Sequence, residues 1–175
     1  MLAAAAVAVG PERITVVGQR LRFGTMSVRC AIGRGGIRAD KREGDGATPS
    51  GLFPLREVLY RADRVRAPVA ALPVSSIGPL DGWSDDPADP DYNHRVTMPR
   101  AFHTEPLWRA DHLYDLLAVI GASDDPVVSG RGSAIFLHVA SARYGPTDGC
   151  VAVSMPDLLA LLARCGRETE IEIRV

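Results

Sequence analysis

Residues 134–153 read AIFLHVASARYGPTDGCVAV, and this stretch decides the fold. Within residues 133–140, the near-continuous apolar run from Ala134 to Leu137 is typical of a central strand that is buried on both faces. Residues 151–153 predict the next short strand. His138 ends the first strand and Cys150 precedes the second, twelve positions later (150 minus 138). If the two strands are neighbours, the imidazole and the thiol meet at one rim of the sheet.

The segment that follows predicts one helix over about 155–165. Ser154 suits the N-cap, Pro156 and Asp157 suit the first turn, and Gly166 ends the helix. Four leucines supply its apolar stripe: Leu158, Leu159, Leu161 and Leu162. Residues 169–175 then alternate between apolar and charged side chains, which predicts a last strand.

Further strands are predicted in the part of the chain before residue 134. Apolar side chains alternate with polar ones at residues 14–16, 21–23 and 26–32, and residues 112–120 form a further buried run. The fold class is therefore mainly β with minor α: a β-sandwich of mixed sheets, or a barrel, with one helix near the C-terminus.

Composition excludes several classes of protein. The chain has 175 residues, with 20 basic and 21 acidic side chains, so it lacks the basic surplus that nucleic-acid binding needs. Its 46% hydrophobic content excludes a disordered chain, and no apolar run reaches the roughly 20 residues of a membrane span. We expect one domain over residues 1–175. Residues 1–10 are either a signal remnant or a disordered lead-in, and the absence of Lys or Arg before the apolar run favours the lead-in.

The three cysteines differ in their surroundings. An odd number does not suit a disulfide framework. Cys30 lies in a strand pattern and Cys165 near a helix end, so both are interpreted as buried thiols. Cys150 follows Gly149 and is the candidate nucleophile, because a nearby imidazole such as His138 can take its proton. Main-chain N–H groups beside a glycine can stabilise an oxyanion. From spacing alone, a small hydrophobe at Cys150 and a polar strand end at His138 remain an equal alternative.

Other polar segments carry weaker signals. The glycine-rich segment 33–51, which includes Glu43-Gly44-Asp45-Gly46, lacks the spacing of a phosphate-binding loop. No HxxxH or HExxH spacing connects the acidic and histidine residues, so we expect no metal site among Asp85, Asp86, His103, Asp111, His112 and Asp115. The Pro- and Asp-rich excursion 68–106 is interpreted as an ordered, packed loop. Three aromatic residues either line a groove or pack in the core: Trp83 and Tyr92 within this loop, and Trp108 just after it.

Two separated motifs make the chain resemble the L,D-transpeptidase catalytic domain family (YkuD-type), which remodels bacterial peptidoglycan. One is the strand-ending His138 followed by Thr147-Asp148-Gly149-Cys150, which matches the family's [S/T]-x-G-C pattern. The other is Thr48-Pro49-Ser50-Gly51-Leu52-Phe53, which matches the upstream TPxGxF signature and follows Gly44-Asp45-Gly46. The resemblance covers roughly residues 14–175 and implies a β-sandwich built on mixed sheets.

The resemblance also implies roles for individual residues. Cys150 would be the nucleophile, and His138 the base, oriented by the main-chain carbonyl of Val139. The N–H groups of Asp148, Gly149 and Cys150 would hold the oxyanion. Thr147 would contact the substrate, whereas Thr48, Pro49 and Gly51 are architectural.

The chain departs from the family pattern at two positions. Many relatives have Arg two positions after the cysteine, where this chain has Ala152, and Gly after the histidine, where it has Val139. The first departure puts recognition of a substrate carboxylate in question. Arg131 and Arg143 flank the motif and are either replacement cations or, by default, solvated surface arginines. Trp83 is a candidate groove residue.

The implied activity is that of a cysteine-dependent L,D-transpeptidase, an acyltransferase of cell-wall biogenesis and cell shape. It would release D-alanine from a stem peptide through an acyl-thioester and join two diamino acids, with no cofactor and no metal. Carbapenem-type inhibitors and both stem peptides are the expected partners. Alternatives are an L,D-carboxypeptidase or endopeptidase using the same site, and a non-catalytic peptidoglycan-binding module. A papain-like protease is disfavoured, because its Cys precedes its His. The substrate places the protein in the periplasm or cell envelope.

Overall fold

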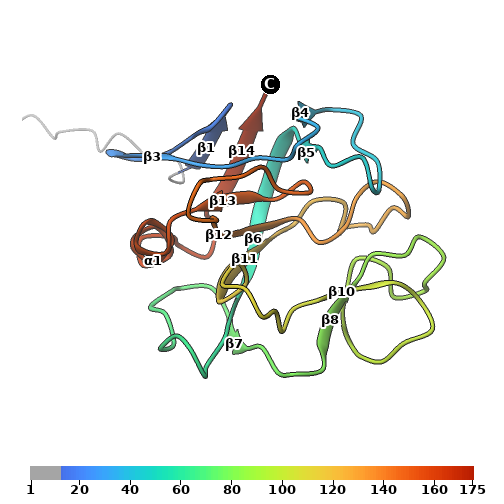
Figure 1. Ribbon diagram of the computed structural model, residues 1–175. Coiled ribbons are helices and arrows are strands. Elements are labelled where there is room, and N and C mark those ends of the chain that lie inside the picture. Colours follow the sequence, from blue (N-terminus) through green and yellow to red (C-terminus); the bar gives the residue numbers. More distant parts are fainter. Residues whose placement is uncertain (1–12) are drawn as a thin grey trace, which may run out of the picture.

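The computed structural model describes residues 13–175 and shows strands from distant parts of the chain gathered into one large sheet (Figure 1). The strands and the helix are β1 (Arg13–Val17), β2 (Arg20–Phe23), β3 (Met26–Arg29), β4 (Ile37–Arg38), β5 (Thr48–Pro49), β6 (Gly51–Tyr60), β7 (Val74–Ser76), β8 (Asp81–Ser84), β9 (Arg95–Thr97), β10 (Thr104–Pro106), β11 (Leu116–Ile120), β12 (Phe136–Val139), β13 (Val151–Val153), α1 (Met155–Leu162) and β14 (Glu170–Arg174).

The large sheet has nine strands and mixed directions. Its order is β13-β12-β11-β6-β14-β1-β2-β3, with β7 paired to β6. The long strand β6 connects its two halves, because β6 pairs with β14 near its start and with β11 near its end. Three pairs are parallel, β1 with β14, β6 with β7, and β12 with β13, and the others are antiparallel. The result is nearly closed into a barrel-like sandwich.

This architecture confirms the predicted fold class, mainly β with one helix, while some element ends differ. The helix ends at Leu162 rather than near residue 165, because the chain tightens there and the Arg164 N–H bonds to the Leu161 carbonyl at 3.0 Å. Strand β12 begins at Phe136, three residues later than expected, because Ala134 has a left-handed φ of 51°. Strand β11 begins at Leu116, after a turn that starts at His112.

Strand β12, which lies between β13 and β11, separates two hydrophobic cores. Leu137 and Val139 point into the larger core, which also receives the apolar stripe of α1. Phe136 points the other way, into a smaller core with Trp83 and Cys150. Successive side chains of a strand alternate between faces, so His138 lies on the same side as Phe136. Burial on both faces therefore fixes the direction in which the imidazole projects.

The excursion over residues 68–106 is ordered and packed, as the sequence indicates. It carries a three-stranded sheet in the order β10-β8-β9, which lies on the opposite side of the molecule from α1 in Figure 1. Trp83 is buried, stands edge-on to Phe136 with ring centroids 5.1 Å apart, and donates to Asn93 Oδ1 at 2.9 Å. The excursion thus covers one face of the central strands.

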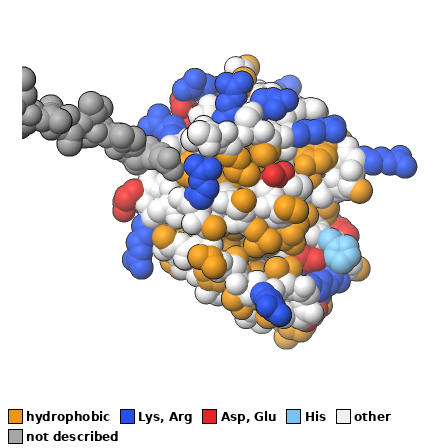
Figure 2. Space-filling view, turned by 90° about the vertical axis from the view of Figure 1, so that its left-hand side faces the viewer, with side chains coloured by type: hydrophobic (Ala, Val, Ile, Leu, Met, Phe, Trp, Pro, Cys, Tyr) orange, Lys and Arg blue, Asp and Glu red, His pale blue; other side chains and the backbone are white. Residues whose placement is uncertain are grey.

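The face at the left of Figure 1 is shown directly in Figure 2. Lys and Arg side chains gather along its upper edge, at the height of β1–β3 in Figure 1, and hydrophobic side chains cover its middle. Exposed arginines on β2 and β3 make the end of the sheet unattractive for pairing with another strand. Within the described residues 13–175, no helix has the length and apolar character to cross a membrane.

Candidate active site

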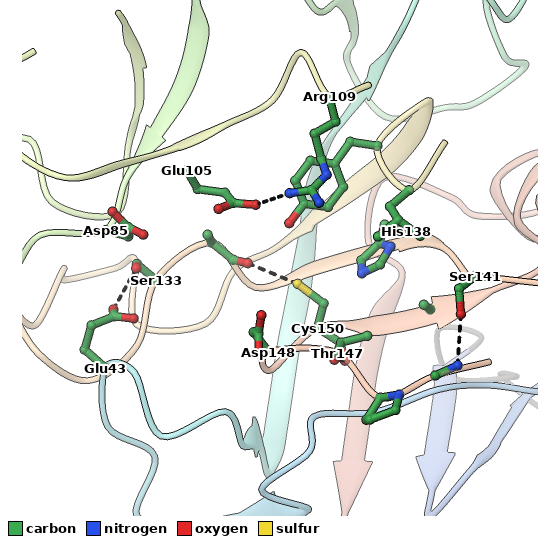
Figure 3. A pocket seen from close by; sticks show the side chains of 16 residues that line it. Glu43, Asp85, Glu105, Arg109, Ser133, His138, Ser141, Thr147, Asp148 and Cys150 are labelled. Carbon is green, nitrogen blue, oxygen red and sulfur yellow. Dashed lines mark hydrogen bonds and ion pairs between the residues drawn. The ribbon is translucent and has the colours of Figure 1, made fainter. Parts of the chain in front are cut away.

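The pairing of β12 with β13 brings the candidate nucleophile and base together. The two strands are parallel, and His138 is the direct partner of Ala152 in the ladder. Cys150 and Ala152, two residues apart, project to the face from which His138 projects. All three line one cavity of about 240 Å³. Figure 3 shows the imidazole projecting into this cavity from β12 and the sulfur from Cys150, the residue directly before β13.

His138 is held in the neutral form that can accept a proton. Its Nδ1 lies 2.9 Å from the carbonyl oxygen of Val139, and a carbonyl only accepts, so Nδ1 carries the proton and Nε2 keeps its lone pair. Burial lowers the pKa of His138 to about 4, although the Val139 and Leu113 main chain oppose that shift. Tyr114 packs edge-on against the ring, with centroids 5.3 Å apart. The imidazole is therefore a fixed neutral base near neutral pH.

Cys150 is a protonated thiol in this structure. Its Sγ donates to the Ala134 carbonyl at 3.2 Å and accepts from the Phe136 N–H at 3.3 Å. Burial raises the pKa of the thiol to about 12, and the Phe136 N–H counters this only in part. No hydrogen bond joins the sulfur to the imidazole in the described part of the chain. Proton transfer to His138 thus requires the thiol to leave the Ala134 carbonyl.

The depressed pKa of His138 predicts a loss of stability in acid. The pKa is about 4 in the folded protein against an ordinary 6.5, so below pH 6.5 the unfolded chain takes up a proton that the folded state refuses. Stability falls as the pH drops through this window, by about 2–3 kcal/mol at pH 4.5 from this residue. Urea unfolding at pH 7 and 4.5 measures the loss. Between pH 7 and 4.5, the His138→Asn variant should lose about 2–3 kcal/mol less stability than the wild type. Equal losses in the two proteins would contradict the depressed pKa of His138.

The main chain of Cys150, the candidate nucleophile, is held by two threonine hydroxyls. Thr147 Oγ1 donates to the Cys150 carbonyl at 2.7 Å, and Thr48 Oγ1 approaches the same oxygen at 3.4 Å. Thr48 also accepts from the Gly33 N–H at 2.8 Å. The TPxGxF segment therefore supports the cysteine directly. Thr147 lines the cavity, but its hydroxyl is engaged within the protein.

The turn before Cys150 has a conformation that only glycine adopts easily. Gly149 has a φ of 136°, and a Cβ there would lie 2.9 Å from the Ala47 carbonyl oxygen. Its N–H lies 3.3 Å from Thr147 Oγ1. The neighbouring Asp148 side chain is exposed and forms an ion pair with Arg34. Asp148 and Cys150 line the cavity, whereas Gly149 is buried and is not among the lining residues.

The other sequence candidates for substrate contacts lie outside this cavity. Arg131 and Arg143 are exposed, and neither is among the residues that line it. Trp83 lines a second cavity, which also contains Arg56 and Asn93. Ala152 is 1% exposed and places only a methyl group beside His138. The structure therefore brings no flanking arginine to the position left by Ala152.

Some residues of the cavity had no signal in the sequence. Arg109 is its one cation in the described part of the chain; it pairs with Glu105 at 2.9 Å and with Asp111 at 2.7 Å. Tyr114 and the Ala134 carbonyl position the base and the thiol, respectively. Glu43 reaches the cavity from the glycine-rich segment 33–51, where no motif distinguishes its carboxylate from the other charged residues.

The remaining candidates have structural surroundings. Tyr92 is buried and Trp108 is half-buried, with the Arg61 guanidinium 3.5 Å from the centre of the Trp108 ring. Cys30 and Cys165 are buried as expected, and burial raises the pKa of Cys30 to about 11. The acidic and histidine residues form pairs, such as Asp85 with His103 and Asp115 with His112. Over residues 13–175 no group of three or more potential ligands is placed to hold a metal.

The geometry agrees with a comparison against family models. The model described as L,D-transpeptidase catalytic domain (YkuD) matches residues 5–173, nearly the whole chain. No curated protein and no solved structure matches the chain. With a match of this extent, the chain belongs to the YkuD family of L,D-transpeptidase catalytic domains, whose members act on the peptides of peptidoglycan.

Proposed function

We propose that this protein is a cysteine-dependent L,D-transpeptidase that acts on peptidoglycan stem peptides. The observation that carries the proposal is the shared cavity of Cys150 and His138, with the imidazole fixed by Val139 so that Nε2 can accept a proton. A thiol needs such a base because only the thiolate attacks efficiently. Family membership supports the kind of substrate.

In the first half-reaction, binding of the peptide breaks the hydrogen bond between the Cys150 thiol and the Ala134 carbonyl. His138 Nε2 then accepts the thiol proton. The sulfur attacks the carbonyl carbon of the diamino acid. The main-chain N–H groups of Asp148, Gly149 and Cys150 are proposed to hold the oxyanion. The amide C–N bond then breaks, and His138 gives its proton to the departing D-alanine amine. An acyl-thioester of Cys150 remains.

In the second half-reaction, an amine of another stem peptide attacks the thioester, while His138 takes one of its protons. The C–S bond breaks, the thiol regains the proton, and a new amide joins two diamino acids. Water in place of the amine would make the same site an L,D-carboxypeptidase or endopeptidase. Ser141, Gly145 and Pro146 line the cavity and are exposed, so a second peptide has access to the site as well as water, and the family match supports the transpeptidase.

The proposed substrate also gives the proposed location. Peptidoglycan stem peptides are cross-linked outside the cytoplasmic membrane, so the protein would act in the periplasm or cell envelope. Expression of the chain from its natural gene, followed by fractionation of the cells, tests this location. Recovery with cytoplasmic markers would contradict it.

Exposure to a carbapenem tests the nucleophile. Its strained β-lactam amide should acylate Cys150, and the intact mass should rise by the mass of one carbapenem, because the opened ring stays attached. Cys150→Ala should give no adduct. Cys30→Ala removes another buried thiol that lies outside the cavity and should react like the wild type. An adduct that persists in Cys150→Ala would contradict the assignment.

Muropeptides then identify the acceptor. Purified tetrapeptide-bearing muropeptides should yield D-alanine and a cross-linked dimer, which mass spectrometry detects. D-alanine without a dimer would favour the carboxypeptidase. Binding of muropeptides with no acylation of the wild type would favour a non-catalytic binding module of the same fold.

A further inference from the structure

The cavity around Cys150 is acidic, and one of its carboxylates differs from the others. Three have a basic partner: Asp85 with His103, Glu105 with Arg109, and Asp148 with Arg34. Glu43 has no ion pair with any Lys, Arg or His of the described residues. Among the carboxylates of the cavity lining it is therefore the one without a basic partner in the described part of the chain, and a bound cation could neutralise its charge.

The carboxylate of Glu43 is nevertheless held firmly. The hydroxyl groups of Tyr92 and Ser133 both donate to its Oε2, the latter at 2.7 Å. The Gly44 N–H donates to Oε1 at 3.1 Å. The Tyr92 hydroxyl is itself fixed, because it accepts from the Gly132 N–H at 3.1 Å. A charged group that is held by neutral donors at the wall of a cavity is pre-organised for a ligand of opposite charge.

The direction of the substrate follows from the chemistry of the site. His138 must reach the leaving amine, so the leaving group lies on the side of Cys150 where His138 projects. The acyl part of the substrate then extends to the other side. Figure 3 shows Glu43, Ser133 and Asp85 at that other side, with Cys150 between them and His138.

We propose that Glu43 binds the side-chain ammonium group of the residue whose carbonyl Cys150 attacks, so that the site selects a donor with a basic side chain. This inference rests on the proposed function and assigns a specificity residue to it. Arg109 is a poorer anchor for a substrate group, because Glu105 and Asp111 already neutralise its charge. The net charge of the cavity lining thus favours a cation over a carboxylate.

Binding to the Cys150→Ala protein tests the inference without turnover. Two tetrapeptides serve as probes, one with lysine at the position before D-alanine and one with N6-acetyl-lysine there. Calorimetry should give about tenfold tighter binding for the lysine peptide, and the preference should shrink at high salt. Adding Glu43→Gln should remove the preference while retaining the affinity for the acetylated peptide, since an amide oxygen still accepts from Tyr92 and Ser133. Equal affinities of both peptides for the Cys150→Ala protein would overturn the inference.

Turnover provides the second readout. In a protein with Cys150 intact, Glu43→Gln should lower kcat/KM for the lysine donor by about tenfold, chiefly through KM, and leave the acetylated donor unchanged. Glu57→Gln, a half-buried glutamate that lines the other cavity, is the matched control and should behave like the wild type. An equal loss for both donors would mean that Glu43 is only structural. If the wild type turns over neither peptide, the proposed function fails, and the binding data still decide the role of Glu43.

Discussion

The His138→Asn variant is expected to react with a carbapenem about 1,000-fold more slowly than the wild type at pH 7. The thiol of Cys150 has a pKa of about 12, so roughly one molecule in 10⁵ is a thiolate at that pH. The wild type avoids this limit, because the neutral imidazole takes the proton as the sulfur attacks. Asparagine keeps an N–H for the Val139 carbonyl and removes the basic Nε2.

The pH dependence separates this explanation from a loss of structure. The wild-type rate should stay nearly level from pH 5 to 8, since the pKa of His138 is about 4 and the base is already neutral there. The variant depends on free thiolate, so its residual rate should rise about tenfold per pH unit throughout the range below the thiol pKa of about 12. Stopped-flow absorbance or timed intact-mass measurements give both profiles. A level profile for the variant would show that His138 is not the base.

Replacing Gly149 by Ala should lower the acylation rate at least about 100-fold and the free energy of unfolding by about 2–4 kcal/mol. The residue has a φ of 136°, which L side chains rarely adopt, and its new Cβ would lie 2.9 Å from the Ala47 oxygen. This oxygen belongs to the main chain next to Thr48, so moving it would also disturb the neighbouring backbone. The turn must shift instead, and with it the sulfur and the amides proposed to hold the oxyanion.

Gly18 is the control that separates backbone strain from the steric clash of a new Cβ atom. Gly18 also has a left-handed φ, of 53°, but a Cβ there would meet no atom within 4 Å. Gly18→Ala should therefore cost about 1 kcal/mol of stability and leave acylation unchanged. Urea unfolding and carbapenem acylation, applied to both variants, measure the two effects. A Gly149→Ala protein that acylates at the wild-type rate would remove the turn from the proposed mechanism.

Elements with a clear local pattern of apolar, capping or motif residues can be predicted from the sequence. The apolar run before His138 predicted a central strand, and α1 followed from Ser154 and the leucines. The motif around Cys150 predicts this residue as the nucleophile. By contrast, the candidate cations Arg131 and Arg143 are close to Ala152 in sequence but lie outside the cavity. Proximity along the chain was a poor guide, because the cavity is also lined from the excursion and the loop before β11.

The sequence by itself determined which strands are buried, where the helix begins, and which thiol and imidazole belong to one family motif. These features depend on periodicity and on neighbouring residues, which a single chain displays directly. The tertiary structure alone decided the protonation of the site and its charge. Burial sets the pKa values of His138 and Cys150, and the carboxylate of Glu43 comes from a segment 107 residues before Cys150 (150 minus 43). Desolvation and long-range pairing arise only when distant segments pack together, so no local pattern encodes them.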